Sequence, residues 1–205
     1  MRILAYTLSV VFHPLFLVVY AFMLQRYYNP YMFGSGILQR FDFYLIYFSV
    51  LTALLPTVAM LVMRGLGFIE TMEMRTGDER VGPLIATGIL YIWMFLNVQH
   101  LDGMPDIFKF FVLGATLGLF AAFFINLFTK ISLHSIGMGG LVGMLFLFYL
   151  FYSFDDLSWL LLAGIVAAGA VGTARLYLKA HEPNEVYGGL LVGFVAQFLA
   201  FKIIV

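Results

Sequence analysis

Long runs of hydrophobic residues alternate with short polar segments along the whole chain. A run of about 20 apolar residues is long enough to cross a bilayer as an α-helix. By this rule the sequence predicts seven candidate spans, of which the third and the fifth are short. We therefore expect an all-α fold, a polytopic transmembrane helical bundle of six to seven spans. The candidate spans are about Ala5–Leu24, Phe43–Met63, Pro83–Asn97, Ile107–Phe128, Gly137–Tyr152, Trp159–Tyr177 and Val186–Ile204.

The composition agrees with a membrane location and argues against other classes. Of the 205 residues, 63% are hydrophobic and 11% are charged, and the mean hydropathy is +1.00. A soluble domain with this balance would expose a large apolar surface. The absence of cysteine rules out disulfides and thiolate metal sites, and the formal net charge of zero argues against nucleic-acid binding. We expect one integral membrane domain over residues 1–205, in a cell membrane such as the bacterial inner membrane.

The polar loops divide between the two faces of the membrane according to the number of preceding spans. Loops 64–82, 129–136 and 178–185 follow an even number of predicted spans, so they return to the side that holds Met1. We call this side the Met1 face. These loops are the richest in His, Arg, Lys and Glu, and their convergence predicts a single site there. The positive-inside rule would place the Met1 face in the cytoplasm. However, most of its cations are also candidates for chemistry, so the orientation stays open.

The loop before the last span holds the pattern Arg175-x5-His181-x3-Glu185. Ionisable groups are costly at membrane depth, so a cluster of them at a membrane boundary is a candidate functional site. Pro183 suits the first turn of a helix. Glu185 would then occupy the third helical position, from which its carboxylate can reach back toward His181.

The loop before the fifth span brings a cation, a hydroxyl and an imidazole together in Lys130, Ser132 and His134. The ammonium and hydroxyl groups can donate to an anionic oxygen, and the imidazole can exchange a proton near neutral pH. If Gly137 opens the fifth span, free backbone amides would add to a phosphate site. A snorkelling Lys and a His bonded to a nearby carbonyl explain the loop equally well.

Together, the loops supply two imidazoles, a carboxylate oriented at one of them, and several cations. Arg75 and Arg80 belong to a mixed-charge loop that gains interest only because it faces the other two. The sequence holds no carboxylate cluster suited to Mg²⁺ or a dinuclear metal. This inventory fits metal-free phosphoryl transfer, with one imidazole attacking phosphorus and the other protonating the leaving oxygen. We expect no cofactor.

These residues resemble the type 2 phosphatidic acid phosphatase superfamily of membrane lipid phosphatases from about residue 70 to the C-terminus. That family's third motif, Ser-Arg-x5-His-x3-Asp, corresponds here to Ala174-Arg175-x5-His181-x3-Glu185. The Val-Tyr-Gly-Gly that follows resembles the start of the family's last helix. The resemblance implies a phosphatase-like core over about residues 70–205, preceded by N-terminal helices over about residues 1–64.

The other two motifs of the family match less closely. The second, Pro-Ser-Gly-His, corresponds to Ile131-Ser132-Leu133-His134. The first, Lys-x6-Arg-Pro, corresponds loosely to Arg75-x6-Gly82-Pro83, with Arg80 as a stand-in for the missing arginine.

The resemblance implies roles for individual residues. His181 would be the nucleophile that forms a phosphohistidine, Glu185 would orient it, and His134 would be the general acid. The substrate would be a lipid phosphate or diphosphate held among membrane lipids, and nothing in the sequence indicates the oligomeric state. The phosphate would be bound by Ser132, Arg175 and either Arg75 or Arg80, to which local chemistry adds Lys130.

Two other functions remain open at this stage. The eroded first motif permits a relative that binds or transports a phosphorylated lipid without hydrolysing it. A metal enzyme could use His134, His181, Glu185 and Glu79, although Pro183 lies between the two ligands of the last loop.

His13, in the first predicted span, also has two interpretations. It is either a neutral imidazole bonded to a carbonyl that Pro14 frees or a residue that lines the site. Elsewhere, the small-residue pairs Gly139-x3-Gly143 and Gly189-x3-Gly193 predict close helix packing.

Overall fold

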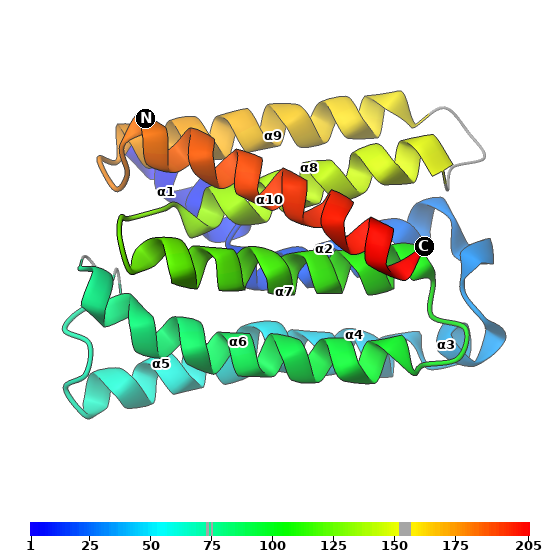
Figure 1. Ribbon diagram of the computed structural model, residues 1–205. Coiled ribbons are helices and arrows are strands. Elements are labelled where there is room, and N and C mark those ends of the chain that lie inside the picture. Colours follow the sequence, from blue (N-terminus) through cyan, green and yellow to red (C-terminus); the bar gives the residue numbers. More distant parts are fainter. Residues whose placement is uncertain (73, 75, 152–156) are drawn as a thin grey trace.

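A computed structural model describes residues 1–72, 74, 76–151 and 157–205 as a bundle of roughly antiparallel helices (Figure 1). Two short irregular segments, η1 (Pro30–Met32, 3-10) and η2 (Val50–Leu54, π), interrupt the α-helices. The α-helices are α1 (Arg2–Val11), α2 (Pro14–Tyr28), α3 (Ser35–Gln39), α4 (Phe41–Ser49), α5 (Leu55–Gly65), α6 (Gly77–Gln99), α7 (Asp106–Asn126), α8 (Leu133–Phe151), α9 (Ser158–Tyr177) and α10 (Pro183–Ile204).

The predicted all-α transmembrane bundle is confirmed. Within the described residues, 6 helical stretches are long and apolar enough to cross a membrane, and the bent pair α1–α2 brings the number to 7 if it counts as one span. The chain is therefore a multi-pass membrane protein. The third and fifth spans are not short, because their helices begin at Gly77 and Leu133, before the apolar runs do. The first turns of these helices contain polar residues, so the pattern of apolar runs did not include them in the predicted spans.

The first span differs from the continuous helix predicted over Ala5–Leu24. α1 ends at Val11, α2 begins at Pro14, and the two helices are bent by 61°. Pro14 has no amide hydrogen, and its ring would clash with a preceding helical carbonyl, so it can start a helix but not continue one. The residues on either side of the bend pack against different helices, α1 against α9 and α2 against α8.

The charged loops converge as the alternation of spans predicts. The N-terminus and the α5–α6, α7–α8 and α9–α10 connections lie at one end of the bundle, and the C-terminus lies at the other (Figure 1). This end is the Met1 face. Toward the opposite end, the core is aromatic: Phe22 is fully buried and its ring stacks on Phe41 at 4.7 Å. Phe48 and Phe108 each pack against Phe22 at 5.0 Å.

Close contact between α8 and α10, predicted from their glycines, is also present. A Cβ atom added to Gly193 would overlap the carbonyl oxygen of Ile136, and one added to Gly139 would overlap that of Leu190. At Gly189 a Cβ would lie 2.8 Å from the Cβ of Ser135 and 2.9 Å from the carbonyl oxygen of Ser132. These glycines let the two backbones touch, which brings the first turn of α8 against the first turn of α10.

Candidate active site

A cavity of about 860 Å³ opens among the charged loops of the Met1 face and extends into the bundle. Its inner wall is largely apolar, and along α6 it reaches from Arg80 to Tyr91, which is about 16 Å at about 1.5 Å of rise per residue. All three histidines of this half of the molecule line it, together with cations from several segments. These polar lining residues are Arg2, His13, Arg80, Lys130, His134, Arg175, Lys179 and His181.

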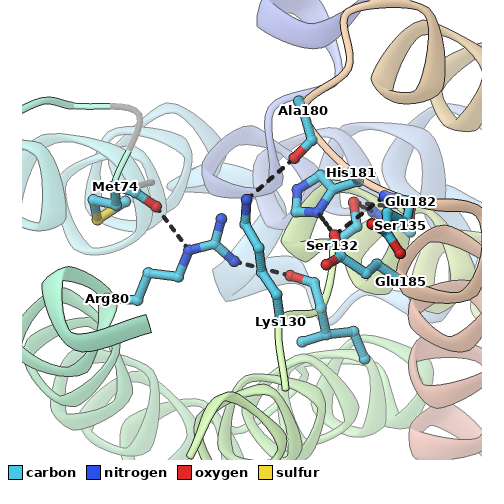
Figure 2. Close-up of polar contacts among 10 residues, drawn as sticks. Met74, Arg80, Lys130, Ser132, Ser135, Ala180, His181, Glu182 and Glu185 are labelled. Carbon is cyan, nitrogen blue, oxygen red and sulfur yellow. Dashed lines mark hydrogen bonds and ion pairs between the residues drawn. The ribbon is translucent and has the colours of Figure 1, made fainter. Parts of the chain in front are cut away.

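His181, which lines the cavity, pairs with Glu185 at the start of α10 (Figure 2). The N-cap of α10 is Glu182 and Pro183 is its first residue, which puts Glu185 at the third position, as the sequence predicts. From there Glu185 Oε2 lies 2.6 Å from His181 Nδ1 and also accepts from the Glu182 amide at 3.3 Å. The side chains of His181 and Glu185 are only 4% and 12% exposed. The start of the helix thus fixes the direction of the imidazole.

The protonation of His181 follows from these contacts. Burial, assisted by the positive charges of Arg175 and Arg80, lowers the pKa of His181 to about 4, although Glu185 opposes the shift. The ring is therefore neutral near pH 7. A carboxylate accepts only, so the single ring hydrogen is on Nδ1 and the lone pair is on Nε2. His181 presents the cavity with an unprotonated nitrogen, the form that a nucleophile requires.

Arg80 is buried and tied to two loops. Its Nε donates to the carbonyl of Met74 at 2.9 Å, and its Nη1 donates to that of Ile131 at 3.2 Å (Figure 2). A guanidinium carries five N–H donors, so these bonds hold Arg80 and leave donors for an anion in the cavity. Arg80, the stand-in for the missing arginine of the first motif, therefore lines the same cavity as His181. Arg75 lies outside the described residues.

Lys130 and Arg175 add to the cationic lining. The Lys130 ammonium donates to the carbonyl of Ala180 at 3.4 Å, which links the α7–α8 loop to the loop that carries His181 (Figure 2). Arg175, in the last turn of α9, donates from Nη1 to the Ser9 hydroxyl at 3.4 Å. Cations from several segments thus line one cavity, an arrangement suited to the oxygens of a phosphoryl group.

Ser132 occupies a different position from the one predicted for a phosphate ligand. It is fully buried and does not line the cavity. Its Oγ accepts from the amide of Ser135 at 3.3 Å and from the Ser135 hydroxyl at 2.9 Å. Ser132 therefore caps α8, a common role for serine at a helix start.

The helix that Ser132 caps begins at Leu133 and not at Gly137. Gly137 lies inside the helix, where a Cβ would meet the side chain of Leu17 at 2.6 Å. The first turn, with Leu133 and His134, is the part of α8 that lines the outer cavity. The positive end of the α8 helix dipole thus lies at the cavity, with the helix beginning four residues earlier than predicted.

His134 combines the two interpretations that the sequence left open. Its Nε2 lies 3.0 Å from the carbonyl oxygen of Ser9, so the imidazole is bonded to a backbone carbonyl, and it also lines the cavity. His13 lines the cavity as well. Its Nδ1 accepts from the amide of Leu15 at 3.4 Å and caps α2, and within the described residues it makes no bond to a freed carbonyl. The His13 and His134 rings meet edge to face with centroids 5.0 Å apart.

Sequence reasoning missed two residues that the structure brings to the site. Ser9 contacts both His134 and Arg175 from helix α1, a long-range contact that leaves no local signal. Lys179 lines the cavity with a φ of 53°, a left-handed conformation that ends α9 and that usually selects glycine. The sequence signal for this left-handed conformation is weak: it consists of a lysine, in place of the usual glycine, just after the end of α9.

Glu79, the first-loop carboxylate considered as a metal ligand, has another role. Glu79 Oε1 accepts from the amide of Glu70 at 2.9 Å, and Oε2 accepts from that of Thr76 at 3.2 Å. The bond from Thr76, together with that from the Glu79 amide to the Thr76 hydroxyl at 3.4 Å, forms the capping box at the start of α6. Within the part of the chain that the structure describes, no group of three His, Asp or Glu side chains is placed to hold a metal ion.

Comparison with known proteins gives a family match over the C-terminal part of the chain. The family model of the PAP2 superfamily matches residues 122–205, the region that holds both His134 and the Arg175–Glu185 motif. Residues 122–205 are therefore similar to the type 2 phosphatidic acid phosphatase superfamily. Neither the curated proteins nor the solved structures gave a significant match. Phosphatases predominate in this superfamily, which also includes non-catalytic members.

Proposed function

We propose that the protein is an integral membrane phosphatase that hydrolyses a lipid phosphate or diphosphate through a phosphohistidine intermediate, without a metal ion. The observation that carries this proposal is the buried His181–Glu185 pair, 2.6 Å apart, in which His181 lines a cavity together with Arg80, Lys130 and Arg175. A neutral imidazole with its free lone pair among cations is suited to attack an anionic phosphoryl group.

In the first half-reaction, Nε2 of His181 attacks phosphorus and the bond to the leaving oxygen breaks. The leaving oxygen takes a proton from the imidazolium form of His134, which becomes neutral, and the phosphorylated ring of His181, now cationic, is balanced by the Glu185 carboxylate. In the second half-reaction, water attacks the same phosphorus and returns a proton to His134. The phosphorus–nitrogen bond breaks, inorganic phosphate leaves, and His181 is again neutral.

The shape of the cavity supports an amphiphilic substrate. The charged residues gather at the Met1 face, and the cavity continues inward past Leu84, Phe111 and Leu119. A phosphate head group at the mouth would thus have an apolar surface beneath it for a hydrocarbon chain. We further propose that the substrate enters from the surrounding membrane lipids, in a cell membrane such as the bacterial inner membrane.

A second function, binding or transport of a phosphorylated lipid without hydrolysis, is favoured by one specific observation. The first motif lacks an arginine before Pro83, and the arginine that fills the place, Arg80, is already bonded to two carbonyls. Such a protein would bind the head group and not turn it over.

A substrate panel distinguishes the two functions. Purified protein is assayed for phosphate release from phosphatidate, phosphatidylglycerophosphate and a polyprenyl diphosphate, with and without EDTA. We expect EDTA-insensitive phosphate release from at least one substrate, and we expect His181→Ala to abolish it. The matched variant His100→Ala should retain it, because His100 is exposed and does not line the cavity. Binding of the lipids without any release would contradict the proposed hydrolysis and favour the second function.

A further inference from the structure

The break in the first span leaves a backbone carbonyl that a continuous helix would use. In an unbroken helix, the carbonyl of Ser9 would accept from the amide of His13. Here the His13 amide donates to Val10 instead, at 3.2 Å, and Pro14 has no amide to donate. The last carbonyls of a helix need partners from elsewhere.

Three of these terminal carbonyls find partners close by in the sequence, and the fourth does not. Leu8 accepts from the Phe12 amide at 3.0 Å, Val10 from His13, and Val11 from the hydroxyl of Tyr20 at 3.0 Å. The partner of the Ser9 carbonyl is Nε2 of His134, at 3.0 Å, from a helix more than 120 residues further along the chain. Ser9 is only 5% exposed, so this bond lies in the interior of the protein.

The bond determines the tautomer of His134. A carbonyl oxygen only accepts, so the ring hydrogen of neutral His134 must be on Nε2. The other nitrogen, Nδ1, is then the atom that gains and loses a proton. In the protonated ring, the Ser9 carbonyl would accept from a charged donor, which strengthens that bond.

His13 holds the same ring from another side. Its own Nδ1 is used by the Leu15 amide, which fixes the His13 ring at the start of α2. The His13 ring meets the His134 ring at 86° with centroids 5.0 Å apart, a favourable edge-to-face arrangement. The bend thus presents a carbonyl and an aromatic ring to one imidazole.

We propose that the broken first span is a positioning element for His134: the Ser9 carbonyl and the His13 ring hold its imidazole so that Nδ1 is the atom that donates the proton to the leaving oxygen. In the imidazolium form of His134, the proton passes from Nδ1 to that oxygen as its bond to phosphorus breaks. Nε2 keeps its hydrogen throughout, and the attacking water of the second half-reaction returns a proton to Nδ1. Ser9 and His13 lie outside the region that matches the family model, residues 122–205. The catalytic consequence rests on the proposed phosphatase function, whereas the tautomer does not.

The tautomer is measured by NMR on full-length protein labelled with ¹⁵N-histidine, with signals assigned by His134→Asn and His181→Asn. We expect opposite tautomers, Nε2–H in His134 and Nδ1–H in His181. An Nδ1–H or rapidly averaging His134 would overturn the positioning proposal whatever the activity. An averaging His181 would instead count against the proposed function, so the two failures are distinguishable.

Substitutions at His13 separate ring packing from helix capping. His13→Asn keeps an N-cap acceptor and loses the ring, whereas His13→Phe keeps an aromatic ring and loses the acceptor. We expect kcat of His13→Asn to fall about 3- to 10-fold with KM unchanged, and kcat of His13→Phe to exceed that of His13→Asn. Equal kcat in His13→Asn and the wild type, or a His13→Phe variant that is the slower of the two while equally stable, would overturn the role of the ring.

Discussion

Replacement of Glu185 by glutamine tests the pair on which the proposed chemistry depends. The substitution keeps the size of the side chain and an oxygen that can accept from His181 Nδ1, which lies 2.6 Å from Oε2. It removes only the negative charge. The ground state should change little, because charge adds only about 1 kcal/mol to a hydrogen bond.

The transition state should lose much more. As Nε2 forms its bond to phosphorus, the ring of His181 becomes cationic next to the carboxylate. Coulomb's law with an effective dielectric constant of about 20 gives about 6 kcal/mol for unit charges at the 2.6 Å separation of Nδ1 and Oε2. Each 1.36 kcal/mol is about tenfold in rate, and screening reduces the full value. We therefore expect kcat to fall about 10²- to 10⁴-fold, with KM changed less than about threefold.

Steady-state phosphate release from the best substrate of the panel measures both constants. Glu70→Gln is the matched control, because Glu70 is exposed on the same face of the bundle and does not line the cavity. Its kcat should equal that of the wild type. A Glu185→Gln protein that keeps kcat within about threefold would refute the account of an oriented imidazole.

Three further predictions concern helix packing, a backbone conformation and pH. Gly189→Ala should destabilise the protein by about 1–3 kcal/mol in thermal unfolding and lower kcat. Gly188→Ala should do neither, because a Cβ there meets nothing within 4 Å. Equal stability of the two variants would contradict the close packing of α8 and α10. Lys179→Gly should raise the unfolding temperature, because glycine adopts the φ of 53° at this position without strain. It should also raise KM, because the cavity loses a cation. An unchanged KM would show that Lys179 is not part of the substrate site. Since the pKa of His181 is lowered to about 4, activity should persist at mildly acidic pH and fall as the pH drops through that value. Glu185→Gln removes a group that raises this pKa, so the fall in activity should move to lower pH.

The parts of the site that local sequence determines could be predicted. The pair His181 and Glu185 followed from a four-residue spacing around a helix-starting proline, since the geometry of a first helical turn is nearly constant. The convergence of the loops on one face followed from counting spans. Both depend on regular features that the rest of the chain does not alter.

The parts that depend on distant contacts could not be predicted. The motif suggests that Ser132 is a phosphate ligand, but serine also commonly caps helices. The start of α8 at Leu133, which makes Ser132 the capping residue, decides between the two roles. The bend at Pro14 had a sequence signal in the proline itself, which a continuous apolar run outweighed. No pattern of residues near Ser9 indicates that its carbonyl binds His134.

The most direct test of the central claim is to trap the phosphorylated enzyme. Protein mixed with excess substrate is quenched in alkali, digested and analysed by mass spectrometry. The account predicts one acid-labile, alkali-stable phosphoryl group on the peptide that contains His181, absent from His181→Ala. Rapid turnover with no phosphorylated peptide, or a phosphoryl group on His134 in place of His181, would contradict it.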